Sequence, residues 1–320
     1  MPPSKAKAST YTPPTKGILS YLPSSWVPYS ELIRLDKPHG IYMTIYPYIL
    51  GLFYAGQITP APIHLNFLLS RFLNLAIWTF LIRSAGCAWN DNVDQDFDRQ
   101  TARCRDRPIA RGAISTLQGH VFTTALVALG FLSIQDFPLE SKIDGAATVL
   151  LTCIYPFGKR FTHFAQVTLG STLSVSIVFG PHAVGANPLS SENFLPTACL
   201  VSSIIMLVIF YDVVYARQDT ADDLKSGVKG MAVLFRNWIT TLLLSLITAI
   251  TTLLYITGKS LGLSPLFFGL SVAGPAISLL TMIVLIASKS SSSRYAGKFY
   301  VLAIFSLLSG FAVEYSKTIM

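Results

Sequence analysis

The sequence predicts an all-α membrane protein, and three observations lead to that prediction. Apolar residues make up 52% of the 320 residues and charged residues only 12%, which is about half of the share usual in soluble domains. The mean hydropathy is +0.53. The apolar residues gather in long stretches, and a membrane helix needs ~20 such residues. This composition excludes a disordered chain, and four cysteines are too few for a disulfide scaffold.

About nine apolar stretches follow one another along the chain. They cover residues 38–57, 66–90, 115–134, 143–158, 164–184, 194–217, 232–257, 264–287 and 296–315. No repeat of 20–50 residues is visible, which makes a solenoid unlikely to be the fold. We therefore expect a bundle of nine transmembrane helices in one domain, residues 31–320. Residues 1–30 lack the apolar core of a signal peptide, and we expect them to form a flexible cytosolic tail.

Basic residues are unevenly distributed between the predicted loops. If the N-terminus is cytosolic and the stretches alternate in direction, 19 of the 24 basic residues fall on the cytosolic side. This asymmetry is what the positive-inside rule predicts for membrane proteins. The net charge of +8 and the pI near 9.3 are thereby explained by cytosolic loops, without nucleic-acid binding.

Half of the 16 acidic residues lie in two short runs, each at the predicted cytosolic end of an apolar stretch. The first run holds Asp91, Asp94, Asp96 and Asp98, and the second holds Asp212, Asp219, Asp222 and Asp223. On a helix, Asp91, Asp94 and Asp98 fall within roughly 60° of one another, whereas Asp96 points away. In the second run Tyr215 shares the face of the aspartates. Carboxylates this close repel one another, so each cluster needs a cation.

The chemistry of both clusters indicates a hard metal ion and an anionic ligand. All candidate ligands are oxygens, which favours Mg²⁺ or Ca²⁺ over zinc or copper. Basic residues follow each cluster: Arg103, Arg105, Arg107 and Arg111 after the first, and Lys225 and Lys229 after the second. A metal site flanked by arginine and lysine suits a phosphate-rich molecule. Carboxylates in membrane segments are usually functional.

These residues resemble the UbiA superfamily of intramembrane prenyltransferases, in particular its 4-hydroxybenzoate polyprenyltransferase-like branch. Residues 90–98, NDNVDQDFD, match the NDxxDxxxD motif, and residues 219–223, DTADD, match the DxxxD motif. The likeness also covers RLDKP at 34–38, RSAGC at 83–87, RPIA at 107–110 and GVK at 227–229. The resemblance implies nine helices around a central cavity that opens toward the face carrying both motifs.

The resemblance further implies that Mg²⁺ and a prenyl diphosphate bind at the two motifs. If the metal ligands of the family are assigned to the matching positions, one metal site comprises Asn90, Asp91, Asp94 and Asp98, and the other comprises Asp219 and Asp223. Candidate diphosphate contacts are Arg103, Arg107, Lys159 and Lys229, where Lys159 rests on its loop position alone. Tyr215 is a candidate for steadying an allylic cation. Arg34 and Lys37, together with Asp36 and His39, are candidates for the acceptor side.

The activity implied is transfer of a prenyl group to the ring carbon of a phenolic acid, with release of diphosphate. Finer features, such as His39 after RLDKP, are similar to fungal meroterpenoid-pathway members. On that resemblance the expected donor is farnesyl diphosphate, the acceptor an orsellinic-type polyketide acid, and the location the endoplasmic reticulum or a related membrane.

Two alternatives stay open at this stage. Within the family, the chain could be the 4-hydroxybenzoate polyprenyltransferase of ubiquinone biosynthesis, which would place it in mitochondria. A cation-coupled transporter also combines a helical bundle with intramembrane carboxylates. Against a transporter, both clusters are expected at one membrane face and no inverted repeat is evident.

Overall fold

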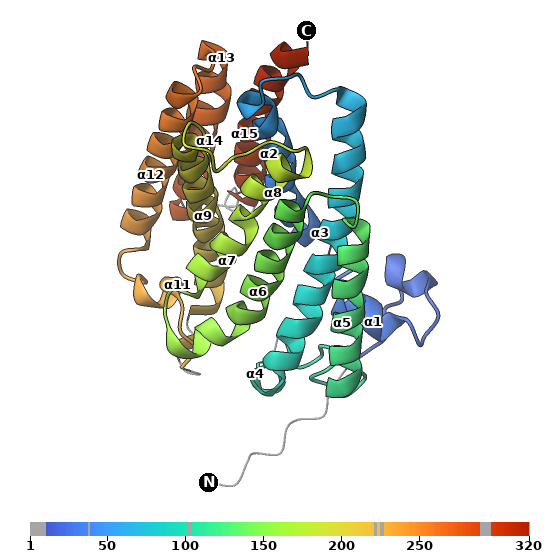
Figure 1. Cartoon of the computed structure of the whole chain (residues 1–320). Helices are drawn as coiled ribbons and strands as arrows, with labels where there is room; N and C mark the ends of the chain where they lie inside the picture. Colours follow the sequence, from blue (N-terminus) through green and yellow to red (C-terminus); the bar gives the residue numbers. More distant parts are fainter. Residues whose placement is uncertain are drawn as a thin grey trace. The chain divides into compact units, whose positions relative to one another are not determined.

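The computed structural model describes residues 11–37, 39–101, 104–220, 223–224, 227–288 and 296–319, except for the Lys159 side chain. All regular structure in these ranges is helical, as the sequence predicts (Figure 1). The chain divides into two compact units. The first comprises Met1–Thr44 and Leu75–Gln135, and the second comprises Ile45–Asn74 and Asp136–Met320. Two helices belong partly to each unit, α2 (His39–Ile58) and α3 (Leu65–Val93).

The first unit contains η1 (Ile18–Tyr21), α1 (Val27–Leu32), the end of α3, α4 (Gln95–Gln100) and α5 (Thr116–Ser133). Its core is a cluster of four residues, each no more than 2% exposed: Leu32, Ala88, Ile109 and Ile114. The start of α5 is fixed by a capping box, in which the Ser115 hydroxyl accepts from the Gln118 N–H and the Gln118 side chain accepts from the Ser115 N–H. Farther along α5, Phe131 packs edge-on against the buried Trp78 of α3.

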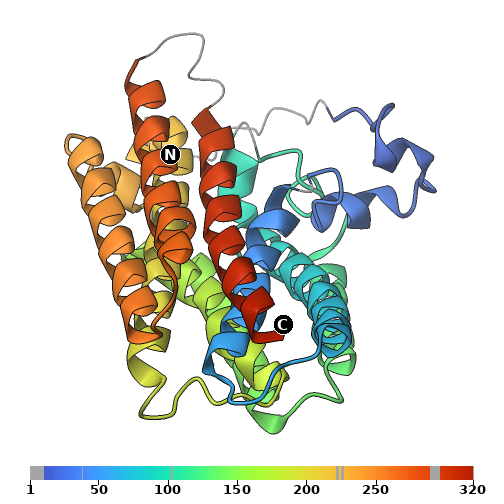
Figure 2. The same ribbon diagram turned by 90° about the horizontal axis from the view of Figure 1, so that it is seen from above.

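The second unit holds the remaining helices. They are α6 (Leu139–Phe161), α7 (Ala165–Ser174), α8 (Ser176–Ala183), α9 (Phe194–Ala216), η2 (Arg217–Asp219), α11 (Met231–Leu234), α12 (Ile239–Ser260), α13 (Pro265–Phe267), the π-helical η3 (Phe268–Ala273), α14 (Gly274–Ala287) and α15 (Ala296–Ile319). Helix α9 packs against both α7 and α12. Helix α14 packs along α15, and Figure 2 shows these two helices side by side. Gly51 of α2 and Gly180 of α8 allow close backbone contact, since a Cβ on Gly180 would lie 2.6 Å from the Gly51 carbonyl carbon.

Several buried hydroxyls in the second unit find partners across helices, which matters because a polar group without a partner is costly in lipid. The Tyr54 hydroxyl lies 2.6 Å from the Thr197 hydroxyl. In η3 the helix widens just before Pro275, which has no N–H to donate. The Ser306 hydroxyl of α15 donates to the Leu270 carbonyl at 2.6 Å instead.

Six helices in the described part of the chain are long and apolar enough to cross a membrane. They are Leu65–Val93, Thr116–Ser133, Phe194–Asp219, Ile239–Ser260, Pro265–Ala287 and Ala296–Ile319. The predicted count of nine is therefore not confirmed. The other three predicted stretches are helical but less suited to span: α2 carries four tyrosines, α6 has charged residues near both ends, and the stretch 164–184 is broken at Val175 into two short helices.

The helix bounds differ from the predicted stretches at two further places. Helix α6 extends beyond residues 143–158 at both ends. The stretch predicted over 232–257 begins as a helix only at Ile239, because α11 ends at Leu234 and a turn over Phe235–Trp238 separates the two helices. The predicted boundary at residue 30 between a flexible tail and the membrane domain stays a prediction. Residues 11–30 include η1 and most of α1.

Candidate functional site

The first aspartate run lies where α3 passes into α4. Helix α3 ends at Val93, and Asp94 then begins α4 while its N–H still donates to the Asn90 carbonyl at 2.9 Å. Asp91, Asp94 and Asp98 are buried, at 1%, 8% and 6% exposure. The Asp96 side chain is 83% exposed and pairs with Arg99 on the surface. The structure therefore shows what helical geometry predicts, with three of the aspartates on a buried face and Asp96 directed away from them.

Two arginines of the same unit converge on the buried aspartates. Arg34 Nη2 lies 2.7 Å from Asp91 Oδ1, and Arg107 Nη1 lies 3.2 Å from the same oxygen. Arg107 Nη1 also contacts both carboxylate oxygens of Asp98, at 3.0 and 2.8 Å. The cation that the sequence requires for this cluster is thus supplied by the chain itself. Arg34, expected on the acceptor side, contacts the first motif.

Burial and charge act in opposite directions on these groups. Burial raises the pKa of the Asp98 carboxyl above its ordinary value, and the charge of Arg107 opposes that rise. Burial also acts to lower the pKa of the Arg107 guanidinium, but the carboxylates of Asp91 and Asp98 outweigh it and hold that pKa above its ordinary value. Arg107 is therefore a permanent cation at this site.

The backbone that carries Arg34 is strained. Arg34 follows α1 with φ +59°, a left-handed conformation that non-glycine residues rarely adopt. The Arg34 N–H donates to the Glu31 carbonyl and the Leu35 N–H to the Ser30 carbonyl, both at 3.0 Å. This pair of bonds is a Schellman ending, whose left-handed position favours glycine. A side chain there costs about 1–2 kcal/mol, and such strain often marks function.

Arg83 fixes the connection between α1 and α2. Its Nη1 donates to the Ile33 carbonyl at 2.6 Å. Gly40 leaves room for this guanidinium, because a Cβ at that position would lie 2.5 Å from Arg83 Nη2. Arg83 therefore anchors the backbone beside Arg34, at the end of α1.

Asp91 presents one oxygen that the arginines do not use. Oδ1 accepts from both Arg34 and Arg107, while Oδ2 is buried and has no hydrogen-bond partner among the described residues. A buried carboxylate oxygen in this state is a favourable ligand for a small cation. In the described ranges no three histidine, cysteine or acidic side chains form a set that could hold a metal ion by themselves.

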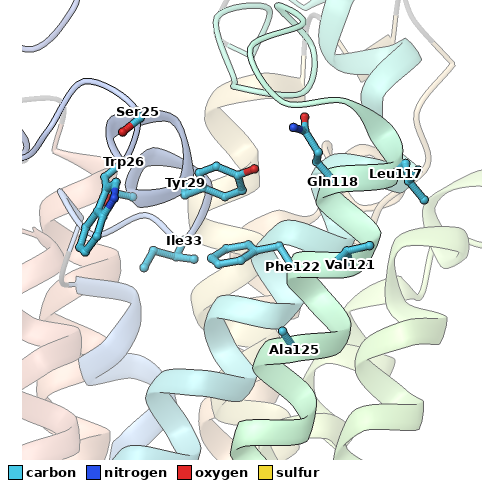
Figure 3. Close-up of a pocket in the computed structure, with 10 residues that line it drawn as sticks. Ser25, Trp26, Tyr29, Ile33, Leu117, Gln118, Val121, Phe122 and Ala125 are labelled. Carbon is cyan, nitrogen blue, oxygen red and sulfur yellow. The ribbon is translucent and has the colours of Figure 1, made fainter.

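A groove of about 830 Å³ lies elsewhere in the first unit, between α1 and the start of α5 (Figure 3). Trp26, Tyr29 and Ile33 line it from one side, and Val121 and Phe122 from the other. None of the aspartates or arginines described above lines this groove. It is an apolar surface feature apart from the polar site.

The second aspartate run lies in the second unit, after α9. Asp219 ends η2, and both Asp219 and Asp223 are partly exposed. Tyr215, in the last turn of α9, is 50% exposed and stacks on Tyr211, with ring centroids 6.4 Å apart. Asp222 lies outside the described residues.

The segment after the second run is bonded to the turn between α6 and α7. The three contacts join Lys229 Nζ to the Phe161 carbonyl at 3.3 Å, the Gly230 N–H to His163 Nδ1 at 3.2 Å, and the Met231 N–H to Gln166 Oε1 at 3.3 Å. These contacts fix the position of Lys229 relative to the end of α6 and the start of α7.

Four predicted site residues remain, and the structure describes the side chains of two of them. Asn90 is partly buried, one turn before Asp94, and Lys37 is exposed. Arg103 lies outside the described residues, and so does the side chain of Lys159, whose backbone belongs to α6.

Sequence reasoning missed several residues that shape these sites. Glu31, Arg83, His163 and Gln166 belong to no motif that was read for its chemistry. The only available signal for Glu31 was its rarity, as one of 16 acidic residues in the chain. The other three act through backbone atoms, which a sequence does not reveal.

The chain is similar to known proteins over nearly its whole length. The model of the UbiA prenyltransferase family matches residues 44–307. Prenyltransferase ascA of Acremonium egyptiacum is 54% identical over 97% of this chain and 92% of its own length. Prenyltransferase stbC of Stachybotrys bisbyi is 47% identical over 98% of this chain and 95% of its own length. DMOA farnesyltransferase nvfB of Aspergillus novofumigatus is 39% identical over 80% of each chain.

Solved structures share the fold at low sequence identity. The apo structure of a UbiA homolog from Aeropyrum pernix matches with a TM-score of 0.70 and 20% identity, covering 86% of this chain and 98% of that one. A UbiA homolog from Archaeoglobus fulgidus, bound to GPP and Mg²⁺, matches with a TM-score of 0.61 and 18% identity, covering 89% of this chain and 99% of that one.

Proposed function

Because the chain belongs to the UbiA prenyltransferase family and is a multi-pass membrane prenyltransferase, we propose that it transfers a farnesyl group to a phenolic acid. The donor is farnesyl diphosphate, the acceptor is an orsellinic-type polyketide acid, and the new bond forms at a ring carbon. The reaction depends on Mg²⁺ at the two aspartate motifs. The pathway is that of a meroterpenoid.

The observation that carries this proposal is the state of Asp91. Its Oδ1 is held by two arginines, and its Oδ2 is buried without a hydrogen-bond partner in the described part of the chain. One or two carboxylates plus phosphate oxygens and water are the usual shell of Mg²⁺. Asp91 would hold this ion together with diphosphate oxygens, and Asn90, Asp94 and Asp98 are the further ligands that the sequence resemblance implies, although the carboxylates alone do not form such a set among the described residues. In the second unit, Asp219 and Asp223 would hold another.

The donor's diphosphate is bound by the cations beside the aspartates. Arg107 carries a planar guanidinium, a group that suits two phosphate oxygens, and its Nη1 keeps Asp98 in place. Arg34 keeps Asp91 oriented. Lys229 supplies a further cation next to the second motif. These residues stabilise the charge that develops on the leaving diphosphate.

The reaction itself breaks one bond and makes another. The C–O bond of the allylic donor breaks, the electron pair leaves with the diphosphate, and an allylic cation remains. Mg²⁺, when bound, neutralises part of the charge of that leaving group. The electron-rich ring carbon attacks the cation, and the same carbon then loses its proton. Apolar surroundings keep water away from the cation, and the exposed ring of Tyr215 is a candidate to steady it.

Farnesyl as the donor group is supported by the relative named DMOA farnesyltransferase and by the sequence resemblance. The same resemblance supports the polyketide acceptor. The positive-inside distribution supports a cytosolic N-terminus, and we place the protein in the endoplasmic reticulum or a related membrane.

A microsomal assay tests the proposal. Geranyl, farnesyl and geranylgeranyl diphosphate are each combined with an orsellinic-type acid and with 4-hydroxybenzoate, and both the prenylated product and released diphosphate are measured. We expect the highest kcat/KM for the farnesyl donor with the orsellinic-type acid, and one diphosphate per product.

Two other outcomes would reject parts of the proposal. Preference for 4-hydroxybenzoate with a longer prenyl chain would favour the ubiquinone-pathway alternative. Absence of diphosphate release with every pair would reject the donor class. The family match already removes the transporter interpretation.

A further inference from the structure

We propose that Glu31 and Arg111 form a positioning pair for the first aspartate motif. Their buried ion pair joins α1 to the loop after α4, and so fixes where Arg34 and Arg107 meet Asp91. This inference rests on the proposed function, because it names residues that act on the site of that function without touching the substrate.

The pair is short and shielded from water. Arg111 Nη2 lies 2.5 Å from Glu31 Oε2, and their side chains are 7% and 15% exposed. Tyr11 contacts both members of the ion pair. Its hydroxyl donates to Glu31 Oε1 at 2.7 Å, and the Arg111 guanidinium lies 3.6 Å from the centre of its ring. An ion pair with this many partners holds one geometry, unlike a pair on the surface.

On the α1 side, the pair is coupled to Arg34 through the helix end. Glu31 is in the last turn of α1, and its carbonyl accepts the Arg34 N–H at 3.0 Å. Arg34 adopts φ +59°, so its side chain leaves the helix in a direction that an extended or helical backbone would not give. A shift of α1 would therefore lengthen the contact between Arg34 Nη2 and Asp91 Oδ1, which are 2.7 Å apart.

On the loop side, the pair is coupled to Arg107 within one turn. The Arg111 N–H donates to the Arg107 carbonyl at 2.9 Å, and Arg111 Nη1 donates to the Asp106 carbonyl at 2.5 Å. The Arg107 N–H in turn donates to the Cys104 carbonyl at 2.9 Å. Arg111 thus braces the turn from which Arg107 reaches Asp91 and Asp98.

The consequence concerns the free oxygen of Asp91. Both arginines contact Oδ1, and this leaves Oδ2 as the oxygen available to a cation. If α1 and the loop separate, either arginine can release Oδ1 or move to Oδ2. The pair therefore keeps the carboxylate turned the way that cation binding needs, as partners of metal ligands commonly do.

The test measures binding of Mg²⁺ with inorganic diphosphate to the full-length protein in detergent, read as the ligand-dependent shift of Tm. We compare the wild type with Glu31→Gln, which removes the charge at constant shape. Glu31→Asp keeps the carboxylate and serves as the conservative variant. Asp96→Asn is the matched control, because it removes a neighbouring ion pair whose side chains are 47% and 83% exposed.

We expect Glu31→Gln to raise the apparent dissociation constant for diphosphate about 10-fold. Glu31→Asp should recover part of that loss, and Asp96→Asn should stay within about 2-fold of the wild type. Donor KM in the transfer assay should rise in parallel, while acceptor KM stays the same. If Glu31→Gln does not fold, Tyr11→Phe removes one hydrogen bond to Glu31, and its dissociation constant should rise about 3-fold.

A lower Tm of the ligand-free Glu31→Gln variant, with a wild-type dissociation constant, would reject the inference and leave a merely structural pair. If Glu31→Gln does not fold, a wild-type dissociation constant of Tyr11→Phe for diphosphate would likewise reject the inference. Absence of any diphosphate response in the wild type would instead reject the proposed function, and the inference with it.

Discussion

The two aspartate motifs differ in how the chain prepares them. In the first unit, Asp91 and Asp98 are buried and already paired with Arg34 and Arg107. In the second unit, Asp219 and Asp223 are partly exposed, and the neighbouring Lys229 donates to a backbone carbonyl. The first motif is thus a buried ionic network, whereas the carboxylates of the second motif are partly open to water.

Because the two motifs differ in burial, the same substitution should have different consequences for stability and activity at each of them. Removing Asp91 takes away the carboxylate that pairs with Arg34 and leaves Arg107 with Asp98 alone, which costs stability as well as activity. Removing a partly exposed carboxylate should cost less stability, because water reaches its position. Stability and activity should therefore separate at the second motif and fall together at the first.

The largest expected effect comes from comparing Asp91→Ala with Asp219→Ala. Both should lower turnover by about 100- to 1000-fold, because each removes a carboxylate that we propose as a ligand of the ion on the leaving diphosphate. Only Asp91→Ala should lower Tm, corresponding to a loss of about 3–5 kcal/mol in the free energy of unfolding. Transfer kinetics and thermal unfolding of both variants check this, and equal Tm values would remove the distinction between the motifs.

The next effect concerns Arg107. Arg107→Ala should lower kcat/KM for the prenyl donor by about 30- to 1000-fold, or roughly 2–4 kcal/mol, and Arg107→Lys should do so less severely. An ammonium group cannot contact Asp91, Asp98 and a phosphate in one plane. Donor and acceptor kinetics in membranes at matched protein level decide this, with acceptor KM unchanged. A wild-type donor kcat/KM for Arg107→Lys would mean that the residue serves only membrane topology.

Arg34→Gly sharpens the same comparison with a smaller effect. Glycine relieves about 1 kcal/mol of backbone strain at φ +59° but gives up the ion pair with Asp91. We expect a net loss of about 1–2 kcal/mol in the wild-type background. In an Asp91→Asn background, where the ion pair is absent, Arg34→Gly should be stabilising. Denaturation of the four proteins of this cycle checks the sign change.

The smallest effect is expected at Asp96. Its side chain is 83% exposed, so Asp96→Ala should change turnover by less than about 3-fold and stability by at most about 1 kcal/mol. The same assays measure it beside Asp91→Ala and Asp94→Ala. If Asp96→Ala were the most damaging of the three, the assignment of the buried face to the site would be wrong.

Much of the fold could be predicted because periodicity and apolar length are local properties. In the described part of the chain all nine apolar stretches are mainly helical, and helical geometry alone turns Asp96 away from the three buried aspartates. The break at Val175 was not predictable from local signals. The late start of α12 at Ile239 follows the polar residues Arg236 and Asn237, which the predicted stretch over 232–257 had included.

The candidate site was predictable in its residue types but not in its partners. The ion pair of Arg34 with Asp91 links positions 57 residues apart, and the pair of Arg111 with Glu31 links positions 80 apart. Such contacts depend on how the chain folds back, as does the left-handed backbone that aims Arg34. The sequence therefore led us to expect a metal ion as the partner of the clustered carboxylates, whereas Arg34 and Arg107 pair with them directly.

The central claim is metal-dependent prenyl transfer at the aspartate motifs, and its most direct test is a Mg²⁺ titration after EDTA treatment. Membranes with the wild-type protein receive farnesyl diphosphate and the phenolic acid, and diphosphate and prenylated product are counted together. We predict no turnover in EDTA, recovery as Mg²⁺ is added, and one diphosphate per product throughout. Full turnover in EDTA would contradict the account, because the carboxylates would then act without the ion they are proposed to bind.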